Sequence, residues 1–163
     1  MAYKINKVLV LGSGVMGSTI AAHFANVGIS SYLLDIVPPK LSDEESKRGL
    51  TEKSLLFRNK FALTNLEKVL KAKPSAFYEK DLAKMITCGN FEDNLNWVSE
   101  VDWVIEVVLE NLEVKKNIFD KVLKFWKEGT ILSTNTSGIS VNQISQNFSI
   151  NAQNHFLGTH FFN

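Results

Sequence analysis

Three closely spaced glycines near the start of this sequence have the spacing needed to bind a phosphate group. Gly12, Gly14 and Gly17 directly follow an apolar run of strand length, and a segment with helical periodicity comes next. In such a turn the first glycine permits the tight bend, the second lets a pyrophosphate approach the backbone, and the third lets the helix pack closely on the strand. The helix N-terminus then directs backbone N–H groups at the phosphates. The spacing therefore predicts a dinucleotide site.

A carboxylate at the end of the next predicted strand indicates which dinucleotide fits. Residues 31–35 form an apolar run that ends in Asp35. A carboxylate there accepts hydrogen bonds from the adenosine ribose hydroxyls and repels the additional phosphate of NADP. No arginine follows directly, since the next residues are Ile36, Val37 and Pro38. The pattern favours NAD, although FAD, another nucleotide, or a glycine turn that binds nothing would also be compatible with these residues.

Polar side chains also follow the later predicted strands, over residues 101–108, 130–134 and 156–161. The carboxyl ends of parallel strands meet at one edge of a sheet, so these side chains could converge on one crevice with Asp35. Each also has a simpler structural explanation, as a turn or cap residue, a surface ion pair, or a histidine that is hydrogen-bonded in the core. The candidates are Glu106, Glu110, Lys115, Asn135, Thr136, Ser137, His160 and Asn163.

The periodicity between these residues predicts an α/β fold with a doubly wound parallel sheet of the Rossmann type. Helices are expected over residues 18–27 and from Asn111 to about Lys127, and a short strand over residues 85–88. After the second strand the chain makes a helical excursion, the arm, at about residues 51–84. A charged loop at 42–48 precedes the arm, which comprises one long helix over 51–73 and a short helix at about 75–84. Its lysines form a solvated face or meet phosphates on a large substrate.

The composition excludes several classes of function. The chain has 163 residues, a net charge of +1 and a single cysteine, Cys88. These values argue against a charge-driven nucleic-acid or membrane partner, a disulfide framework and a cysteine metal site. Cys88 is expected to be a buried small residue rather than a nucleophile. We found neither a signal peptide nor an apolar run of membrane-spanning length, so the expected location is cytoplasmic.

Four motifs in order give the chain a specific resemblance to a known family. These are the turn from Gly12 to Gly17, the segment from Glu106 to Lys115, residues 133–137 and residues 158–163. Together they resemble the NAD-binding domain of L-3-hydroxyacyl-CoA dehydrogenases. Asp35 with the residues after it, and the long arm, more specifically resemble the large bacterial β-oxidation enzymes. The resemblance covers essentially residues 1–163.

The resemblance implies a role for each matching residue. His160 is the general base for the hydroxyl of a 3-hydroxyacyl-CoA substrate, Ser137 holds that hydroxyl, and Asn163 positions the thioester end. A histidine suits this role because it titrates near neutral pH. The NAD site comprises Gly12, Gly14, Val15, Met16, Gly17, Asp35, Glu110, Lys115 and Asn135.

The chain departs from the family pattern at its C-terminus. In the family, a glutamate beyond the catalytic histidine orients the imidazole, and a helical C-terminal domain closes the acyl-CoA cleft and usually dimerises. Neither is present within the 163 residues. The chain is therefore expected to bind NAD while turning over little substrate by itself. Two alternatives stay open: a non-catalytic NAD-binding sensor module, and an NAD-dependent β-hydroxyacid dehydrogenase that acts on a free acid.

Overall fold

A computed structural model describes residues 4–162 of the chain, so Asn163 lies outside the described residues. Six parallel strands form one sheet in the order β3-β2-β1-β4-β5-β6. The strands are β1 (Lys7–Leu11), β2 (Ser30–Asp35), β3 (Ile86–Asn90), β4 (Trp103–Glu106), β5 (Ile131–Asn135) and β6 (Phe156–Thr159). The order reverses at β1, which pairs with β2 on one side and β4 on the other. This confirms the predicted Rossmann-type doubly wound sheet.

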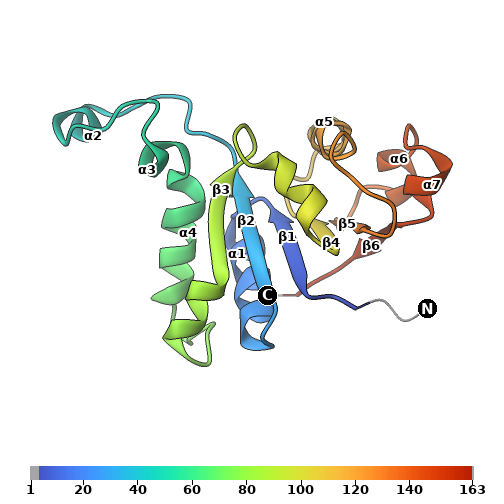
Figure 1. Ribbon diagram of the computed structural model, residues 1–163, viewed down its shortest axis with the longest axis horizontal. Helices are drawn as coiled ribbons and strands as arrows, with labels where there is room; N and C mark the ends of the chain where they lie inside the picture. The colour runs from blue at the N-terminus through green and yellow to red at the C-terminus, as the bar shows by residue number, and fades with distance from the viewer. Residues whose placement is uncertain (1–3, 163) are drawn as a thin grey trace.

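Helices cover both faces of the sheet (Figure 1). One face packs against α1 (Val15–Asn26), α4 (Lys60–Leu70) and the 3₁₀ helix η1 (Lys80–Met85). The other face packs against η2 (Leu95–Glu100), α5 (Leu112–Val122), α6 (Val141–Ile144) and α7 (Ile150–Gln153). The central strand β1 explains why both faces need a cover. Val8 and Val10 enter one core, whereas Leu9 and Leu11 enter the other, and all four are completely buried.

The arm differs from its prediction in two respects. The long helix expected over 51–73 is two helices, α3 (Leu55–Arg58) and α4, which meet at Asn59. At Asn59 the backbone leaves helical geometry, with φ −97° and ψ 9°. Long-range contacts tie down the chain at this point: the Arg58 guanidinium reaches Glu92 and Asp93 in the loop after β3, with 2.8 Å contacts to each, and Asn59 Oδ1 accepts from Asn90 Nδ2 at 2.7 Å. The short helix expected at about 75–84 is a 3₁₀ helix that begins later, at Lys80–Met85.

The segment predicted as a charged loop at 42–48 is helical instead. Helix α2 (Asp43–Lys47) begins at a capping box, in which the Ser42 side chain accepts from the Glu45 backbone and the Glu45 carboxylate accepts from the Ser42 backbone. These reciprocal bonds satisfy two otherwise free N–H groups at the helix start. Helices α2 and α3 project beyond the edge of the sheet at the upper left of Figure 1.

Several element ends also shift from the predicted positions. Helix α1 begins at Val15 rather than at residue 18, and α5 ends at Val122 rather than at about Lys127. Strand β4 is shorter than the predicted 101–108. Strand β6 ends at Thr159, so His160 lies directly after the strand and not within it. The β5–β6 pairing ends at Asn135 and Thr159, and beyond it the Asn135 side chain accepts the Phe161 backbone N–H at 2.8 Å in place of a ladder carbonyl.

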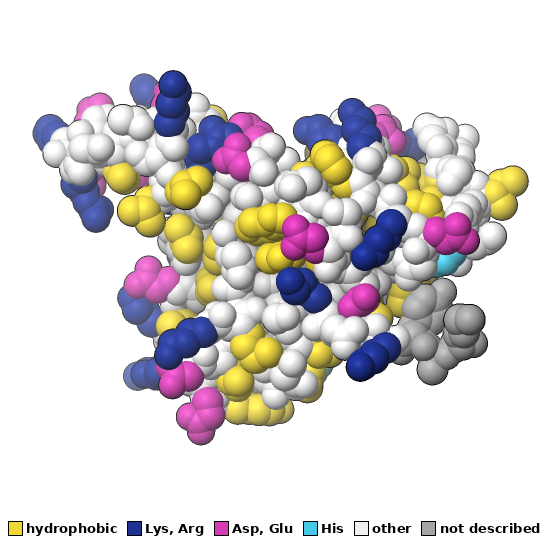
Figure 2. Space-filling model, in the orientation of Figure 1, with side chains coloured by type: hydrophobic (Ala, Val, Ile, Leu, Met, Phe, Trp, Pro, Cys, Tyr) yellow, Lys and Arg dark blue, Asp and Glu magenta, His cyan; other side chains and the backbone are white. Residues whose placement is uncertain are grey.

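The visible surface has no single-sign region. In Figure 2, lysine and arginine side chains alternate with aspartate and glutamate side chains over this face of the molecule. This distribution agrees with the net charge of +1. Within residues 4–162, no helix combines the length and the apolar character that crossing a bilayer requires.

Candidate cofactor and catalytic site

The glycine turn between β1 and α1 has the tight geometry that the sequence predicts. Gly12 has a φ of +99°, a conformation that other residues rarely adopt. A Cβ on Gly17 would lie 1.8 Å from the carbonyl oxygen of Gly12, so only glycine lets α1 begin so close to the strand. A Cβ on Gly14 would meet no atom within 4 Å. The backbone at Gly14 therefore faces open space at the mouth of the turn.

The start of α1 is suited to an anion. Val15, Met16 and Gly17 form its first turn, which no side chain caps and which holds no acidic residue. The backbone N–H groups of a first turn have no partner within the helix, and the helix dipole places a partial positive charge there. Open space at Gly14 and this uncapped first turn together fit a pyrophosphate.

Asp35 lies at the end of β2 beside the glycine turn. Its Oδ2 accepts the backbone N–H of Ser13 at 2.7 Å and also the Ser13 hydroxyl. Its Oδ1 accepts the backbone N–H of Ile36 at 2.7 Å. These bonds fix the carboxylate at the rim of the turn, as a group that binds the adenosine ribose requires.

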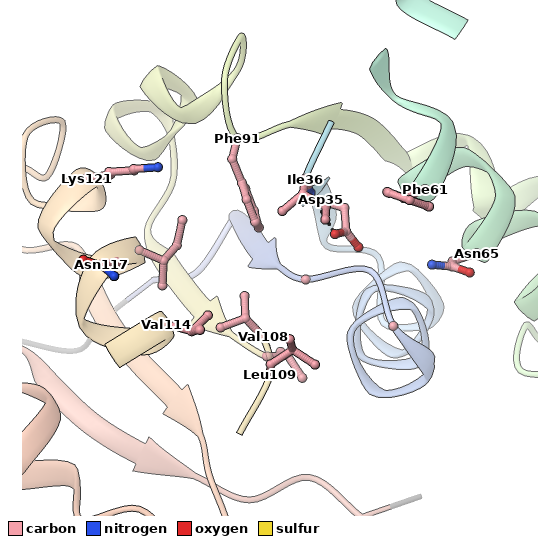
Figure 3. A pocket seen from close by; sticks show the side chains of 14 residues that line it. Asp35, Ile36, Phe61, Asn65, Phe91, Val108, Leu109, Val114, Asn117 and Lys121 are labelled. Carbon is pink, nitrogen blue, oxygen red and sulfur yellow. Dashed lines mark hydrogen bonds between the residues drawn. The ribbon is translucent and has the colours of Figure 1, made fainter. Parts of the chain in front are cut away.

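A cleft of about 560 Å³ opens above the carboxyl ends of β1, β2 and β4. Figure 3 shows Asp35 and Ile36 at its centre, Phe61 and Asn65 from α4 on one side, and residues of α5 on the other. Most of the lining is apolar. The remaining lining residues are Gly12, Gly14, Phe91, Val107, Val108, Leu109, Val114, Asn117, Ile118 and Lys121. Its position at the topological switch point, with the glycine turn and a carboxylate in its wall, fits a dinucleotide.

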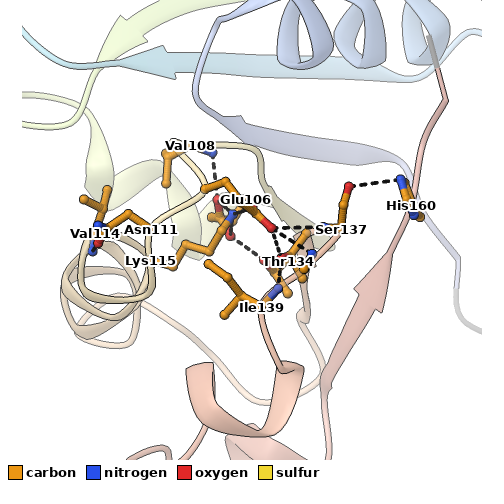
Figure 4. A network of polar contacts seen from close by, with 12 residues as sticks. Glu106, Val108, Asn111, Val114, Lys115, Thr134, Ser137, Ile139 and His160 are labelled. Atoms are coloured by element: carbon orange, nitrogen blue, oxygen red, sulfur yellow. Dashed lines mark hydrogen bonds and ion pairs between the residues drawn. The ribbon is translucent and has the colours of Figure 1, made fainter.

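A second group of predicted residues meets beyond the cleft, at the ends of β4, β5 and β6 (Figure 4). Glu110 is the shared hydrogen-bond acceptor of this group. Its Oε1 accepts the backbone N–H groups of Ser137 and Gly138 at 3.0 and 3.1 Å and also the Thr136 hydroxyl. Partial desolvation raises the pKa of this carboxyl. The hydrogen bonds and the nearby Lys115 charge outweigh that effect and lower the pKa to about 2.

Ser137 and His160 are brought into contact by this arrangement. The Ser137 hydroxyl lies 3.2 Å from His160 Nε2, and both residues are exposed. The imidazole stacks on Phe162, with ring centroids 4.7 Å apart and planes 14° from parallel. The Asn135 side chain accepts the backbone N–H of Phe161, the residue after His160. An exposed histidine beside a fixed hydroxyl can exchange a proton with a ligand at this edge of the sheet.

Lys115 is completely buried beneath the second group. Its Nζ lies 2.8 and 3.0 Å from the two carboxylate oxygens of Glu106 and 3.3 Å from Oε2 of Glu110. Glu106 also accepts the Val108 backbone N–H and the Thr134 hydroxyl. The loop from Val107 to Leu109 lines the cleft, so this network supports the cleft wall and the Glu110 loop together.

The predicted residues therefore fall into two neighbouring groups. The glycine turn and Asp35 border the cleft, whereas Glu110, Asn135, Ser137 and His160 form the second group, with Lys115 below it. The sequence indicates no separate role for Ser13 or Asn65. In the structure, Ser13 donates to Asp35 and Asn65 donates to Ser13. Ser13 sits inside the glycine motif, which is the one signal that could have drawn attention to it. Nothing near Asn65 in the sequence indicates its contact with Ser13.

The fold and these two groups define a dinucleotide-binding domain with a serine–histidine contact at the edge of its sheet. A family model described as "3-hydroxyacyl-CoA dehydrogenase, NAD binding domain" matches residues 7–163. The chain belongs to this family, and its cofactor is NAD.

Relatives and solved structures agree with the family. The chain is 52% identical over 159 residues to the "Probable 3-hydroxyacyl-CoA dehydrogenase" of Bacillus subtilis, covering 98% of this chain and 20% of that protein. It is 42% identical over 160 residues to a protein of the same name from Deinococcus radiodurans, with 98% and 42% coverage. It is similar to the crystal structure of 3-hydroxybutyryl-CoA dehydrogenase from Escherichia coli K12, with a TM-score of 0.70, 28% identity, and 98% and 30% coverage. The chain thus spans less than half the length of each of these proteins.

Proposed function

We propose that this chain is the cofactor-binding part of an enzyme that oxidises the 3-hydroxyl of an acyl-CoA thioester to a ketone in fatty acid β-oxidation. The contact between Ser137 and His160, at 3.2 Å and at the sheet edge next to the cofactor cleft, carries this proposal. The names of the relatives, 3-hydroxyacyl-CoA and 3-hydroxybutyryl-CoA dehydrogenases, supply the substrate class.

In this proposal the glycine turn and α1 hold the pyrophosphate, and Asp35 accepts from the ribose. NAD supplies the acceptor for the hydride that leaves C3 of the substrate. Ser137 donates a hydrogen bond that positions the substrate hydroxyl, and His160 Nε2 takes the hydroxyl proton as the C3–H bond breaks. Glu110 keeps Ser137 in place through the backbone of its loop. The Asn163 side chain, for which no position is described, keeps its expected role near the thioester.

The proposal also includes parts outside these 163 residues. A helical C-terminal domain would close the acyl-CoA cleft, provide the glutamate that orients His160, and join two copies of the complete protein. The much greater length of the relatives supports this part of the proposal. The cytoplasm is the proposed location.

A His160→Ala variant of the complete protein tests the proposed function. We expect kcat for a short 3-hydroxyacyl-CoA substrate to fall by about 10²-fold to 10⁴-fold, the range for loss of a general base. The Kd for NADH should change less than about threefold, because His160 lies outside the cleft-lining residues. A non-catalytic sensor would retain its function in this variant, and a free-acid dehydrogenase would act on the acid better than on the thioester.

The 163-residue chain alone provides the complementary test. It should bind NADH and show no steady-state turnover of an acetoacetyl-CoA-type substrate. Turnover by this chain alone would contradict the proposed role of the additional domain.

A further inference from the structure

Helix α4 of the arm places one polar side chain against the glycine turn. Asn65 lines the cofactor cleft, and its Nδ2 donates to the Ser13 hydroxyl oxygen at 3.1 Å. On its other side, Lys68 Nζ donates to Asn65 Oδ1 at 3.1 Å. Figure 3 shows Asn65 extending from the arm toward the cleft and Asp35. A residue far away in sequence thus reaches the ribose-binding carboxylate through a single intermediate, Ser13.

The chemistry of these groups fixes the direction of every bond. A lysine ammonium only donates, so the amide of Asn65 turns its oxygen to Lys68 and its NH₂ group to Ser13. Because the Ser13 oxygen accepts from Asn65, the Ser13 proton is directed to Asp35 Oδ2. The donors therefore run in one direction, from the arm to the carboxylate.

The acceptor sites of Asp35 show what this relay achieves. A carboxylate has about four lone-pair sites. Oδ2 receives the backbone N–H and the hydroxyl of Ser13, which occupies both of its sites. From residues 4–162, Oδ1 receives only the Ile36 N–H, at 2.7 Å, which leaves it one acceptor site. These bonds oppose rotation of the carboxylate and leave Oδ1 with a site for a ribose hydroxyl, and the relay through Ser13 adds to them.

We propose that Asn65 is a positioning residue that sets the preference for NAD over NADP. It acts through Ser13 to hold the Asp35 carboxylate where Oδ1 accepts from the ribose and where its charge repels a 2′-phosphate. Without Asn65 the backbone N–H groups of Ser13 and Ile36 still hold the carboxylate, but the Ser13 hydroxyl is free to turn away from Oδ2. The carboxylate is then less well ordered, binds the ribose less well and repels a 2′-phosphate less. This inference rests on NAD as the cofactor and not on the proposed oxidation of acyl-CoA, so either can fail without the other.

An Asn65→Leu variant tests the proposal, because leucine keeps the size of the side chain and removes its hydrogen bonds. The Kd values for NADH and NADPH are measured by fluorescence titration of the complete protein. Loss of one ordering hydrogen bond should raise the Kd for NADH by about fivefold to tenfold. The Kd for NADPH should stay constant or fall, so the Kd for NADPH divided by the Kd for NADH decreases. A purely structural defect would instead raise both Kd values equally, which would contradict the proposal.

A second experiment asks whether Asn65 acts through Ser13. In a Ser13→Ala background, Asn65→Leu should cause no further change in the Kd for NADH, because the intermediate is already lost. Full additivity of the two substitutions would show that Asn65 contacts the cofactor itself and would overturn the relay.

Lysines of the arm provide a matched pair of controls. Lys68→Met should raise the Kd for NADH as Asn65→Leu does, but only about twofold. The effect is smaller because the lysine is exposed and partly screened by solvent. Lys71→Met removes an equal charge one turn along the same helix, where the lysine pairs with Glu67. It should leave both Kd values unchanged. Equal effects of the two lysine variants would assign the change to general electrostatics and contradict a specific relay.

Discussion

Lys115 and Glu106 form an ion pair with contacts of 2.8 and 3.0 Å, and both side chains are completely buried. Neither charge reaches water, so each depends on the other. Val108 N–H and the Thr134 hydroxyl complete the coordination of the glutamate. Removing one member of such a pair leaves the other charge buried without compensation.

A Glu106→Gln variant should therefore lower the free energy of unfolding by about 3 kcal/mol. Glu110, 3.3 Å from Lys115, limits the loss because it retains part of the compensation. Urea denaturation measures the change. Glu67→Gln, which breaks the exposed pair with Lys71, serves as the control and should cause a much smaller loss, because solvent screens both charges. Equal losses in the two variants would show that Lys115 needs no charged partner.

Gly14 and Gly17 should separate cofactor binding from stability. A Cβ at Gly17 would overlap the Gly12 carbonyl oxygen, whereas a Cβ at Gly14 meets no atom within 4 Å. Gly17→Ala should lower the free energy of unfolding by at least about 2 kcal/mol, because backbone must move. Gly14→Ala should leave it within about 0.5 kcal/mol and still weaken NADH binding about tenfold, because the methyl group occupies the pyrophosphate approach. Thermal unfolding and NADH titration of both variants check this pattern.

Glu110 should give the protein a specific dependence on acid. Its pKa is lowered from an ordinary 4.5 to about 2, so the folded state binds its proton less readily than the unfolded state. The resulting stability is present above the unfolded value and is lost as the pH falls toward about 2. Glu110→Gln should flatten the pH dependence of the unfolding free energy between about 4.5 and about 2. Urea denaturation across that range measures it, and an unchanged slope would contradict the assignment.

The sequence predicts local features of this protein well because short-range chemistry determines them. The glycine spacing, the apolar strands and the carboxylate after β2 each act within one βαβ unit, and the alternation of strands and helices indicates a parallel sheet. The helix at 43–47 could also have been predicted, since Ser42 and Glu45 have the capping-box spacing. The charge of the segment favours a solvated loop, and the capping box outweighs it.

The remaining features depend on contacts between residues far apart in the chain. At the break between α3 and α4, Arg58 pairs with Glu92 and Asp93 from the loop after β3, a contact that no helical periodicity can indicate. In the same way, Asn65 and Ser13 meet only because the arm folds back over the turn. The burial of Lys115 was unexpected for a related reason. A lysine near a glutamate is usually a surface residue, and only the packing of α5 on β4 encloses it.

Ser137 and His160 should act as one unit if the proposed oxidation is correct. Ser137→Ala removes the hydroxyl that lies 3.2 Å from Nε2 and should lower kcat of the complete protein about 10²-fold, with the Kd for NADH unchanged. Ser137→Thr keeps a hydroxyl and should recover most of that loss.

In a His160→Ala background the Ser137→Ala change should lower kcat far less than it does alone, because the effects of residues that act together are not additive. Steady-state kinetics of the four proteins, from wild type to double variant, measure this coupling. Independent, multiplicative losses would mean that the hydroxyl and the imidazole serve separate purposes despite their contact.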